Sequence, residues 1–275
     1  MVDTAEKARQ WEDIGSDTIC VSAITGNRDF NRLRTIREAV SCELQLIANA
    51  SCLLHCAYEP THMQLLTQSS RSGKGSDRFC LDYCVLHCSY RRLQDPVNFI
   101  RACWIRPEDL SRYESLGYSY FKILERSCPL DLLVKRVQAY TARSFDGNPY
   151  ELVAPMASIT RKLEATLFSR VRMVLSMAQL QKVKMASLLD IHAYMKREIP
   201  DEFSREKAPV YIDNKVLDGF LEEASRHSCG TTDCKGCGVC EAYTEKAVTV
   251  NNKYRADMCS RAEKLNTGIL NGSLW

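Results

Sequence analysis

The stretch that decides the fold is Asp17–Ala48, DTICVSAITGNRDFNRLRTIREAVSCELQLIA. It opens with a short apolar run, Asp17–Ala23, of the kind that forms a buried strand. After Gly26 and Asn27 break the chain, apolar residues recur at helical spacing, namely Phe30, Leu33, Ile36 and Val40. A second apolar run, Leu44–Ala48, follows directly. This strand–helix–strand order predicts that the two strands lie next to each other and run parallel.

The sequence continues this α/β pattern downstream. Phe99–Ile105 and Tyr120–Leu124 are predicted as two further strands, which brings the expected number to four. Between them a helix is expected to start at Arg106, with proline at an early helical position, and to end near Gly117. An amphipathic helix is predicted over Pro129–Arg143.

The chain changes character at the turn Asp146-Gly147-Asn148-Pro149, which is a candidate domain boundary. Beyond it the strand signals fade, and Met156–Met195 and Asn214–His227 are predicted to be helical. We therefore expect a β/α domain over residues 1–150 and a mostly helical, cysteine-rich region over residues 151–275.

Five cysteines gather in Ser51–Arg92, directly after the second predicted strand: Cys52, Cys56, Cys80, Cys84 and Cys88. His55, His62 and His87 lie among them. Thiolates select zinc, copper(I) or iron–sulfur clusters. The first of these cysteines follow the carboxyl end of a strand, where sites collect in parallel α/β folds. We interpret the stretch as a metal site, with the histidines in supporting or substrate-facing roles.

A second group of four cysteines lies in Ser228–Glu241, SCGTTDCKGCGVCE: Cys229, Cys234, Cys237 and Cys240. The run C-x2-C-x2-C with interleaved glycines resembles the loops that wrap iron–sulfur clusters in small ferredoxins. Four close cysteines also form structural zinc sites. The spacing favours iron–sulfur over zinc, and the fourth ligand is either Cys229 or Cys259.

Composition restricts the class of protein. The net charge of +3 among 275 residues gives no argument for a nucleic-acid or membrane partner. No apolar run approaches the roughly 20 residues that span a bilayer, and the first residues are polar, so we expect a cytoplasmic chain. Thiols stay reduced there, which favours metal ligation by many of the 14 cysteines. Three others are interpreted as small buried hydrophobes: Cys20, Cys42 and Cys128.

Two segments carry a resemblance to a known family. Ile47–Cys56, IANASCLLHC, is followed by Ala102–Arg126, ACWIRPEDLSRYESLGYSYFKILER, and then by a helix that leads to Asp-Gly-Asn. This order resembles the collagenase-like U32 peptidase family over about residues 10–150. The resemblance implies a TIM-barrel-like core, of which the four predicted strands would form half. A second copy or another chain would then complete the sheet, because proteins avoid exposed sheet edges.

Some members of that family are iron–sulfur proteins that serve oxygen-independent hydroxylation. The resemblance places cluster ligands at Cys52 or Cys56, Cys80 and Cys84; Ser111 stands where the family has its last cysteine, so Cys88 or Cys103 would replace it. It implies a redox enzyme or subunit acting on a small molecule, a peptide or RNA. One [4Fe-4S] cluster would be catalytic and the second, on Cys229–Cys240, would relay electrons. The predicted pocket residues are His55, Tyr58, Arg91, Arg92, Glu125 and Arg126.

Two alternatives from other classes stay open at this point. One is a metal-dependent peptidase of the U32 type, which requires an open coordination position on the metal. The sequence contains no H-E-x-x-H motif that would support it directly. The other alternative is a zinc-stabilised scaffold without catalytic activity.

Overall fold

The structure is a computed structural model that describes residues 2–62, 64, 84–124, 128–154, 187, 190–191, 194, 203–227, 229 and 234–274. The chain forms two compact units, and both are discontinuous in sequence. The first unit consists of Met1–Cys56, Pro96–Ser158 and Pro200–Val250. The second consists of Ala57–Asp95, Ile159–Ile199 and Asn251–Trp275. The predicted division into domains at residue 150 stays a prediction.

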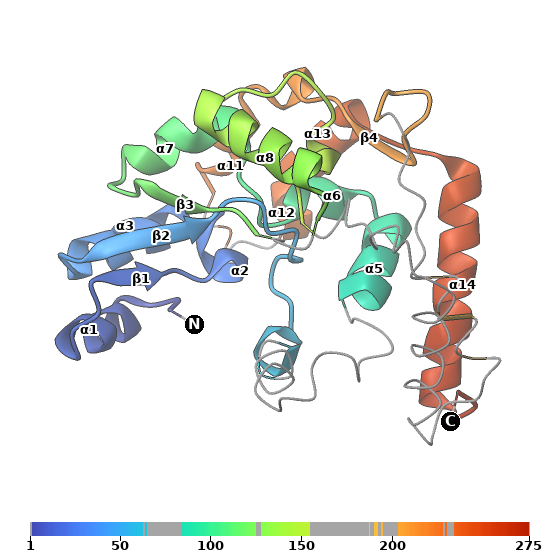
Figure 1. The fold of residues 1–275 in the computed structure, drawn as a ribbon, viewed down its shortest axis with the longest axis horizontal. Coiled ribbons are helices and arrows are strands. Elements are labelled where there is room, and N and C mark those ends of the chain that lie inside the picture. The colour runs from blue at the N-terminus through green and yellow to red at the C-terminus, as the bar shows by residue number, and fades with distance from the viewer. Residues whose placement is uncertain are drawn as a thin grey trace. The chain divides into compact units, whose positions relative to one another are not determined.

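A three-stranded parallel sheet organises the first unit (Figure 1). Its strands are β1 (Thr18–Cys20), β2 (Glu43–Ile47) and β3 (Tyr120–Lys122), in the order β1-β2-β3. Helix α3 (Phe30–Ala39) connects β1 to β2, and Asp29 caps its first turn by accepting a hydrogen bond from the Arg32 N–H at 3.0 Å. The predicted parallel strand–helix–strand unit is therefore confirmed.

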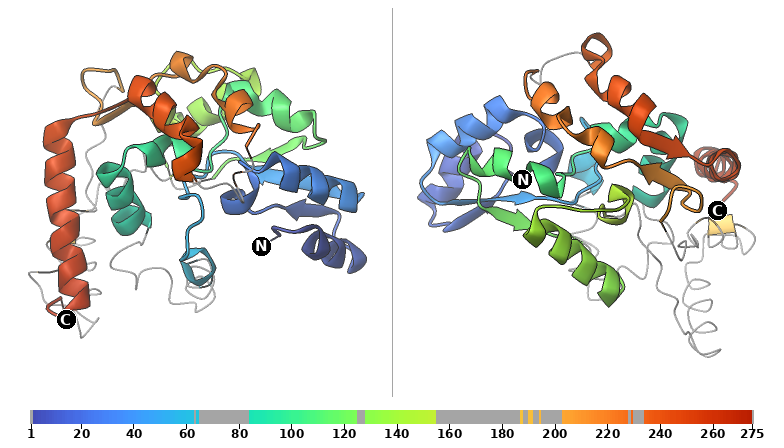
Figure 2. Two further views of the ribbon diagram at one scale, coloured as in Figure 1. Left: turned by 180° about the vertical axis from the view of Figure 1, so that it is seen from behind. Right: turned by 90° about the horizontal axis from the view of Figure 1, so that it is seen from above.

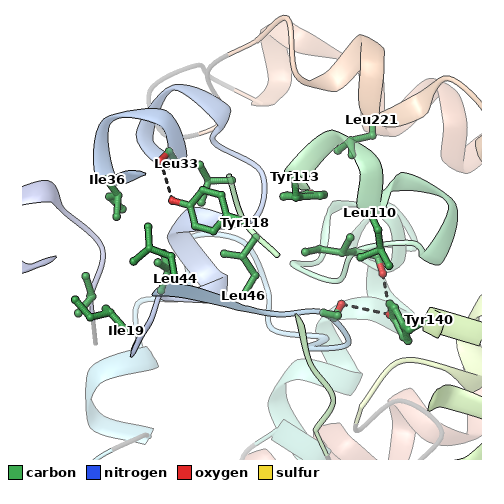
Figure 3. Packing of buried hydrophobic residues seen from close by; sticks show 14 of the residues in the cluster. Ile19, Leu33, Ile36, Leu44, Leu46, Leu110, Tyr113, Tyr118, Tyr140 and Leu221 are labelled. Carbon is green, nitrogen blue, oxygen red and sulfur yellow. Dashed lines mark hydrogen bonds between the residues drawn. The ribbon is translucent and has the colours of Figure 1, made fainter. Parts of the chain in front are cut away.

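Apolar side chains of α3 and β2 form the centre of the core of this unit (Figure 3). Leu33 and Ile36 of α3 and Leu46 of β2 are fully buried, as the helical and strand periodicities require. Two buried tyrosines of this core donate hydrogen bonds to backbone carbonyls. Tyr118 Oη donates to Leu33 O at 2.8 Å, and Tyr140 Oη donates to Ile105 O at 2.8 Å.

Short helices surround this core, and several begin or end at residues that the sequence marks. Helix α8 follows Pro129, and Gly117 has the positive φ of +90° that a turn before β3 needs. Asn148 accepts a hydrogen bond from the Tyr150 N–H at 3.1 Å and so caps η4. The elements are α1 (Ala5–Asp13), α2 (Ala23–Gly26), η3 (Pro107–Asp109), α7 (Leu110–Glu114), α8 (Leu130–Ala142) and η4 (Pro149–Glu151).

The predicted strand over Phe99–Ile105 is wrong. Helix α6 (Val97–Arg101) occupies its first part, and the chain after it pairs with no strand in the part of the chain that the structure describes. The reason lies in Arg28, a buried cation whose guanidinium donates to the carbonyls of Ile100, Ala102 and Trp104 at 3.1–3.3 Å. A neighbouring strand would otherwise have to supply these hydrogen bonds.

The chain from Phe203 to Val250 belongs to the same unit as the sheet. Strands β4 (Val210–Ile212) and β5 (Val248–Val250) form an antiparallel pair that the sequence did not predict. Between them lie η5 (Lys215–Leu217), α11 (Phe220–Ala224), α12 (Cys234–Cys237) and α13 (Val239–Ala247). Arg106 pairs with Asp218 at 2.8 Å and fastens this segment to the start of η3. Seen from behind, α13 packs beside α6 (Figure 2).

The second unit is built around a long C-terminal helix, α14 (Asn252–Leu270). The π-helix η2 (Cys84–Cys88) leads into α5 (Ser89–Gln94), which packs against α14. Tyr90 Oη donates to Glu263 Oε1 at 2.9 Å, and Arg255 donates to the Gln94 carbonyl at 2.7 Å. The predicted helix over Met156–Met195 lies largely outside the described residues.

The expected half of a TIM-barrel-like sheet stays a prediction. The described residues form a mixed α/β arrangement whose three parallel strands do not close into a barrel, and the expected half-barrel of four strands is not confirmed. Completion of the sheet by a second chain stays a prediction. No helix among the described residues is long and apolar enough to cross a membrane.

The fully buried side chain of Asn49 fixes the chain just after β2. Its Nδ2 donates to the carbonyls of Leu124 at 3.4 Å and Leu152 at 3.2 Å, and its Oδ1 accepts from the Leu124 N–H at 2.6 Å. Asn49→Ala leaves these buried backbone groups without partners, and we expect it to lower the free energy of unfolding by about 2–3 kcal/mol. Urea unfolding measures this difference.

Asn31→Ala, at an exposed position of α3, serves as the control for this variant. We expect it to change the free energy of unfolding by less than about 0.5 kcal/mol. An equally small change in Asn49→Ala would contradict the role assigned to the buried amide.

Candidate metal centre

One pocket of the first unit collects the second group of cysteines. Its lining contains Cys229, Cys234, Cys237 and Cys240. The space free of protein atoms at this site amounts to about 380 Å³, a volume that includes open solvent. The four residues thus line one pocket, and their role as metal ligands stays a prediction.

The local backbone explains how three of these cysteines reach one place. Cys234 and Cys237 begin and end the short helix α12, and Cys240 is the second residue of α13. Gly238 joins the two helices with φ of +68°, a conformation that other residues adopt only with strain. Cys240 therefore lies in the first turn of α13, where a helix carries partial positive charge.

The thiols are partly withdrawn from water. Burial raises the pKa of Cys229, and it raises the pKa of Cys240 to about 11; the nearby arginine charges oppose this rise in both thiols. Both thiols also feel the charge of other cysteines in the group. A bound cation would remove this mutual repulsion and stabilise the thiolate forms.

A buried cation lies beside the pocket. Arg28 is 7% exposed, and its guanidinium carbon lies 5.0 Å from the centroid of the Phe220 ring. Its charge acts on both Cys229 and Cys240. Its hydrogen bonds to three backbone carbonyls hold it in place, so its positive charge is a fixed part of the pocket's surroundings.

A second arginine contributes to the pocket wall itself. Arg101, at the end of α6, forms an ion pair with Glu241, the residue after Cys240. Both side chains line the pocket, together with His227. The lining thus combines four cysteines with the guanidinium group of Arg101, and the charge of Arg28 acts on two of these cysteines from outside the lining. This set suits an anionic metal–thiolate group.

Part of the first cysteine group lies close to a residue that lines this pocket. Cys52, Cys56 and Cys103 belong to one apolar cluster with Leu54, and Leu54 also lines the pocket of the second group. The Cys103 N–H donates to the Cys52 carbonyl at 3.1 Å. His55 adopts φ of +55°, and its Nε2 lies 2.7 Å from the Cys229 carbonyl oxygen. Two stretches that the sequence separates therefore meet here.

The remaining predicted ligands and pocket residues are distributed differently. Tyr58, Arg91 and Arg92 fall in the second unit, where Tyr58 and His87 stack edge to face with centroids 5.4 Å apart. Arg92 is buried, whereas Arg91 is exposed. Cys88 is buried in that unit as well. Cys80, the Cys84 side chain, Glu125 and Arg126 lie outside the described residues, so the set as a whole stays a prediction.

Three smaller assignments can be compared with the structure. Cys128 is buried, as predicted, and Cys42 is half-buried. Cys20 is exposed on β1, so its prediction as a buried residue is wrong, because the side chains of this strand alternate and Cys20 takes the outward side. Cys259, the alternative fourth ligand, lies on α14 in the second unit, whereas Cys229 lines the pocket.

The residues present fit a thiolate-bound metal group by their chemistry. Sulfur donors at this number and spacing are those of zinc and iron–sulfur sites. Among the described residues, no three His, Cys, Asp or Glu side chains are already placed to hold a metal ion. Small movements of side chains around the pocket would have to complete the ligand set on binding.

Sequence reasoning missed four residues of this site: Arg28, Arg101, His227 and Glu241. Arg101 lies inside the segment predicted as a strand, which hid its place at the end of a helix. Glu241 directly follows the last cysteine, and this adjacency was a usable signal. No local pattern marks Arg28, whose partners lie 72 to 76 residues further along the chain.

Comparison with known proteins finds one similar protein among those that are curated. The uncharacterized protease MJ1657 of Methanocaldococcus jannaschii is 27% identical over 250 residues, which cover 91% of this chain and 59% of that protein. This relative belongs to the U32 peptidase family, so the resemblance predicted from the sequence is confirmed. The similarity extends well beyond residues 10–150 and takes in most of the later region. No family model matches the chain, and no solved structure matches it either.

Proposed function

We propose that this relative of the U32 peptidases is an iron–sulfur protein that takes part in redox chemistry on a small molecule, a peptide or RNA. The observation that carries the proposal is the convergence of Cys229, Cys234, Cys237 and Cys240 on one pocket with a buried guanidinium beside it. A bound iron–sulfur cluster supplies one-electron transfer. This chain spans 59% of the length of the similar protein. Any catalytic activity of the whole protein is therefore part of the proposal.

The protein's own residues have definite tasks in this account. The four cysteines hold the cluster, and Gly238 lets α12 and α13 present three of them together. Arg28 supplies a fixed positive charge that offsets the negative thiolates. The apolar wall of Leu54 and Val239 limits the access of water, which is one determinant of the reduction potential.

The first cysteine group would hold a second cluster. Cys56 with Cys80, Cys84 and Cys88, or with Cys103 in place of the last, remains the proposed ligand set. Cys52, Cys56 and Cys103 belong to an apolar cluster that includes Leu54, and Leu54 also lines the pocket of the second group, which supports a second metal group near the first. His55 is a neighbour of Cys56 in the sequence and forms a hydrogen bond with the Cys229 carbonyl. It would then link the two cysteine groups.

An absorption spectrum of protein purified without oxygen tests the proposal. We expect a broad band near about 400 nm that bleaches on reduction with dithionite, because thiolate-bound iron–sulfur clusters are coloured and redox-active. A colourless protein without iron would contradict the iron–sulfur assignment. Stoichiometric zinc in such a protein would instead support a zinc-stabilised scaffold.

Peptide hydrolysis is the second candidate, and the name of the relative as a protease favours it. His227 lines the same pocket as the cysteines and could face a metal-bound water if one coordination position stayed open. Cleavage of casein or gelatin that requires added zinc and stops with a chelator would support this function. If the metal-loaded protein cleaves neither substrate, peptide hydrolysis is contradicted.

A further inference from the structure

The side chain of Arg101 is incompletely satisfied inside the cysteine pocket. Its Nη2 pairs with Glu241 Oε1, whereas its Nε–H is buried and has no hydrogen-bond acceptor among the residues that the structure describes. The Arg101 side chain is 20% exposed and that of Glu241 is 40% exposed. The ion pair therefore holds one end of the guanidinium, while no described residue accepts a hydrogen bond from the Nε–H.

Such an arrangement has an energetic cost. A buried donor that belongs to a charged group and lacks an acceptor destabilises a protein, because it has given up its hydrogen bonds to water without replacing them. The four cysteines line the same pocket as Arg101, and the positive charge of Arg101 acts on Cys240. Sulfur that carries negative charge in a metal complex is a suitable acceptor for an N–H donor.

We propose that Arg101 is a positioning residue whose Nε–H donates a hydrogen bond to a cysteine sulfur of the metal-bound centre, with Glu241 holding the guanidinium in place. This inference rests on the proposed function of the pocket as a metal centre. The Arg101–Glu241 pair then helps to retain the metal, in addition to the electrostatic effect of Arg28. The pair would stabilise the thiolate ligands by both charge and direction.

Two substitutions separate the hydrogen bond from the charge. Arg101→Met removes both, whereas Arg101→Lys keeps the charge and loses the Nε–H and the planar fork. The measurement is the concentration of chelator that strips half of the native metal from the purified full-length protein. Loss of an outer-shell partner typically weakens metal binding about 10–100-fold, so we expect both variants to lose metal at a chelator concentration lower by that factor.

The surface ion pair between Arg112 and Glu222, at 2.7 Å in the same unit, provides a matched control. Arg112→Met is expected to retain metal as the unmodified protein does. If Arg101→Lys retains its metal as well as the unmodified protein, the proposed hydrogen bond from Nε–H is overturned. If Arg101→Met does so, any role of Arg101 in metal retention is overturned. Equal metal loss in Arg112→Met would show a general loosening of the fold and would also overturn the proposal.

The outcome for Cys240→Ser separates this inference from the proposed function. If Cys240→Ser keeps all of its metal, the pocket is not the metal centre and the proposed function fails. If Cys240→Ser loses its metal while both Arg101 variants retain theirs, only the inference about Arg101 fails.

Discussion

Replacement of Cys240 by serine is expected to remove the metal of the pocket almost completely. Cys240 lies at the first turn of α13 and lines the pocket with three other cysteines. A serine hydroxyl is a far weaker ligand for soft metals than a thiolate, and the loss of one of four ligands weakens binding by at least about 100-fold. Metal analysis of the purified variant measures this, and thermal unfolding records the accompanying loss of stability.

Two further serine variants test whether the loss of metal is specific to Cys240. Cys20→Ser removes an exposed thiol on β1, outside the pocket, and is expected to keep the full metal content. Cys259→Ser tests the alternative fourth ligand, and because Cys229 lines the pocket we expect this variant to keep its metal too. Equal metal contents in Cys240→Ser and Cys20→Ser would contradict the assignment of the pocket.

Replacement of Trp104 by alanine is expected to cause the largest loss of stability in the first unit. Trp104 is 2% exposed, and its Nε1 donates to the Phe99 carbonyl at 2.9 Å. Its own carbonyl accepts a hydrogen bond from Arg28 at 3.1 Å. Removal of a buried indole leaves a cavity, and such changes cost about 3–5 kcal/mol. Urea unfolding of the full chain under reducing conditions measures the difference.

Trp11 gives a matched control for this prediction, because it is 50% exposed on α1. Trp11→Ala is expected to change the free energy of unfolding by less than about 1 kcal/mol. A similar cost for the two variants would mean that the packing around α6 is looser than the structure shows.

The parts of the fold that were predicted correctly are those with strong local periodicity. Helix α3 and strands β1, β2 and β3 follow directly from apolar spacing, and their parallel order follows from the intervening helix. The strand predicted over Phe99–Ile105 failed because its apolar residues are buried by a short helix and an irregular segment. A short apolar run by itself fits either structure.

The candidate site shows the same division between local and distant information. The spacing of Cys229, Cys234, Cys237 and Cys240 identified a group that the structure places around one pocket. The meeting of His55 with Cys229 joins residues 174 positions apart, and no local pattern encodes it. The pair β4–β5 was missed for a related reason, since each strand has only three residues and its partner is distant.

The most direct test of the central claim is the content of iron, acid-labile sulfide and zinc per chain in protein purified without oxygen. The account predicts iron and sulfide in matching amounts, about four of each per cluster and about eight if both cysteine groups hold one. Most of the iron assigned to the pocket should disappear in Cys240→Ser. Protein that contains neither iron nor zinc, or that keeps its full metal content in Cys240→Ser, would contradict the claim that this pocket is a metal centre.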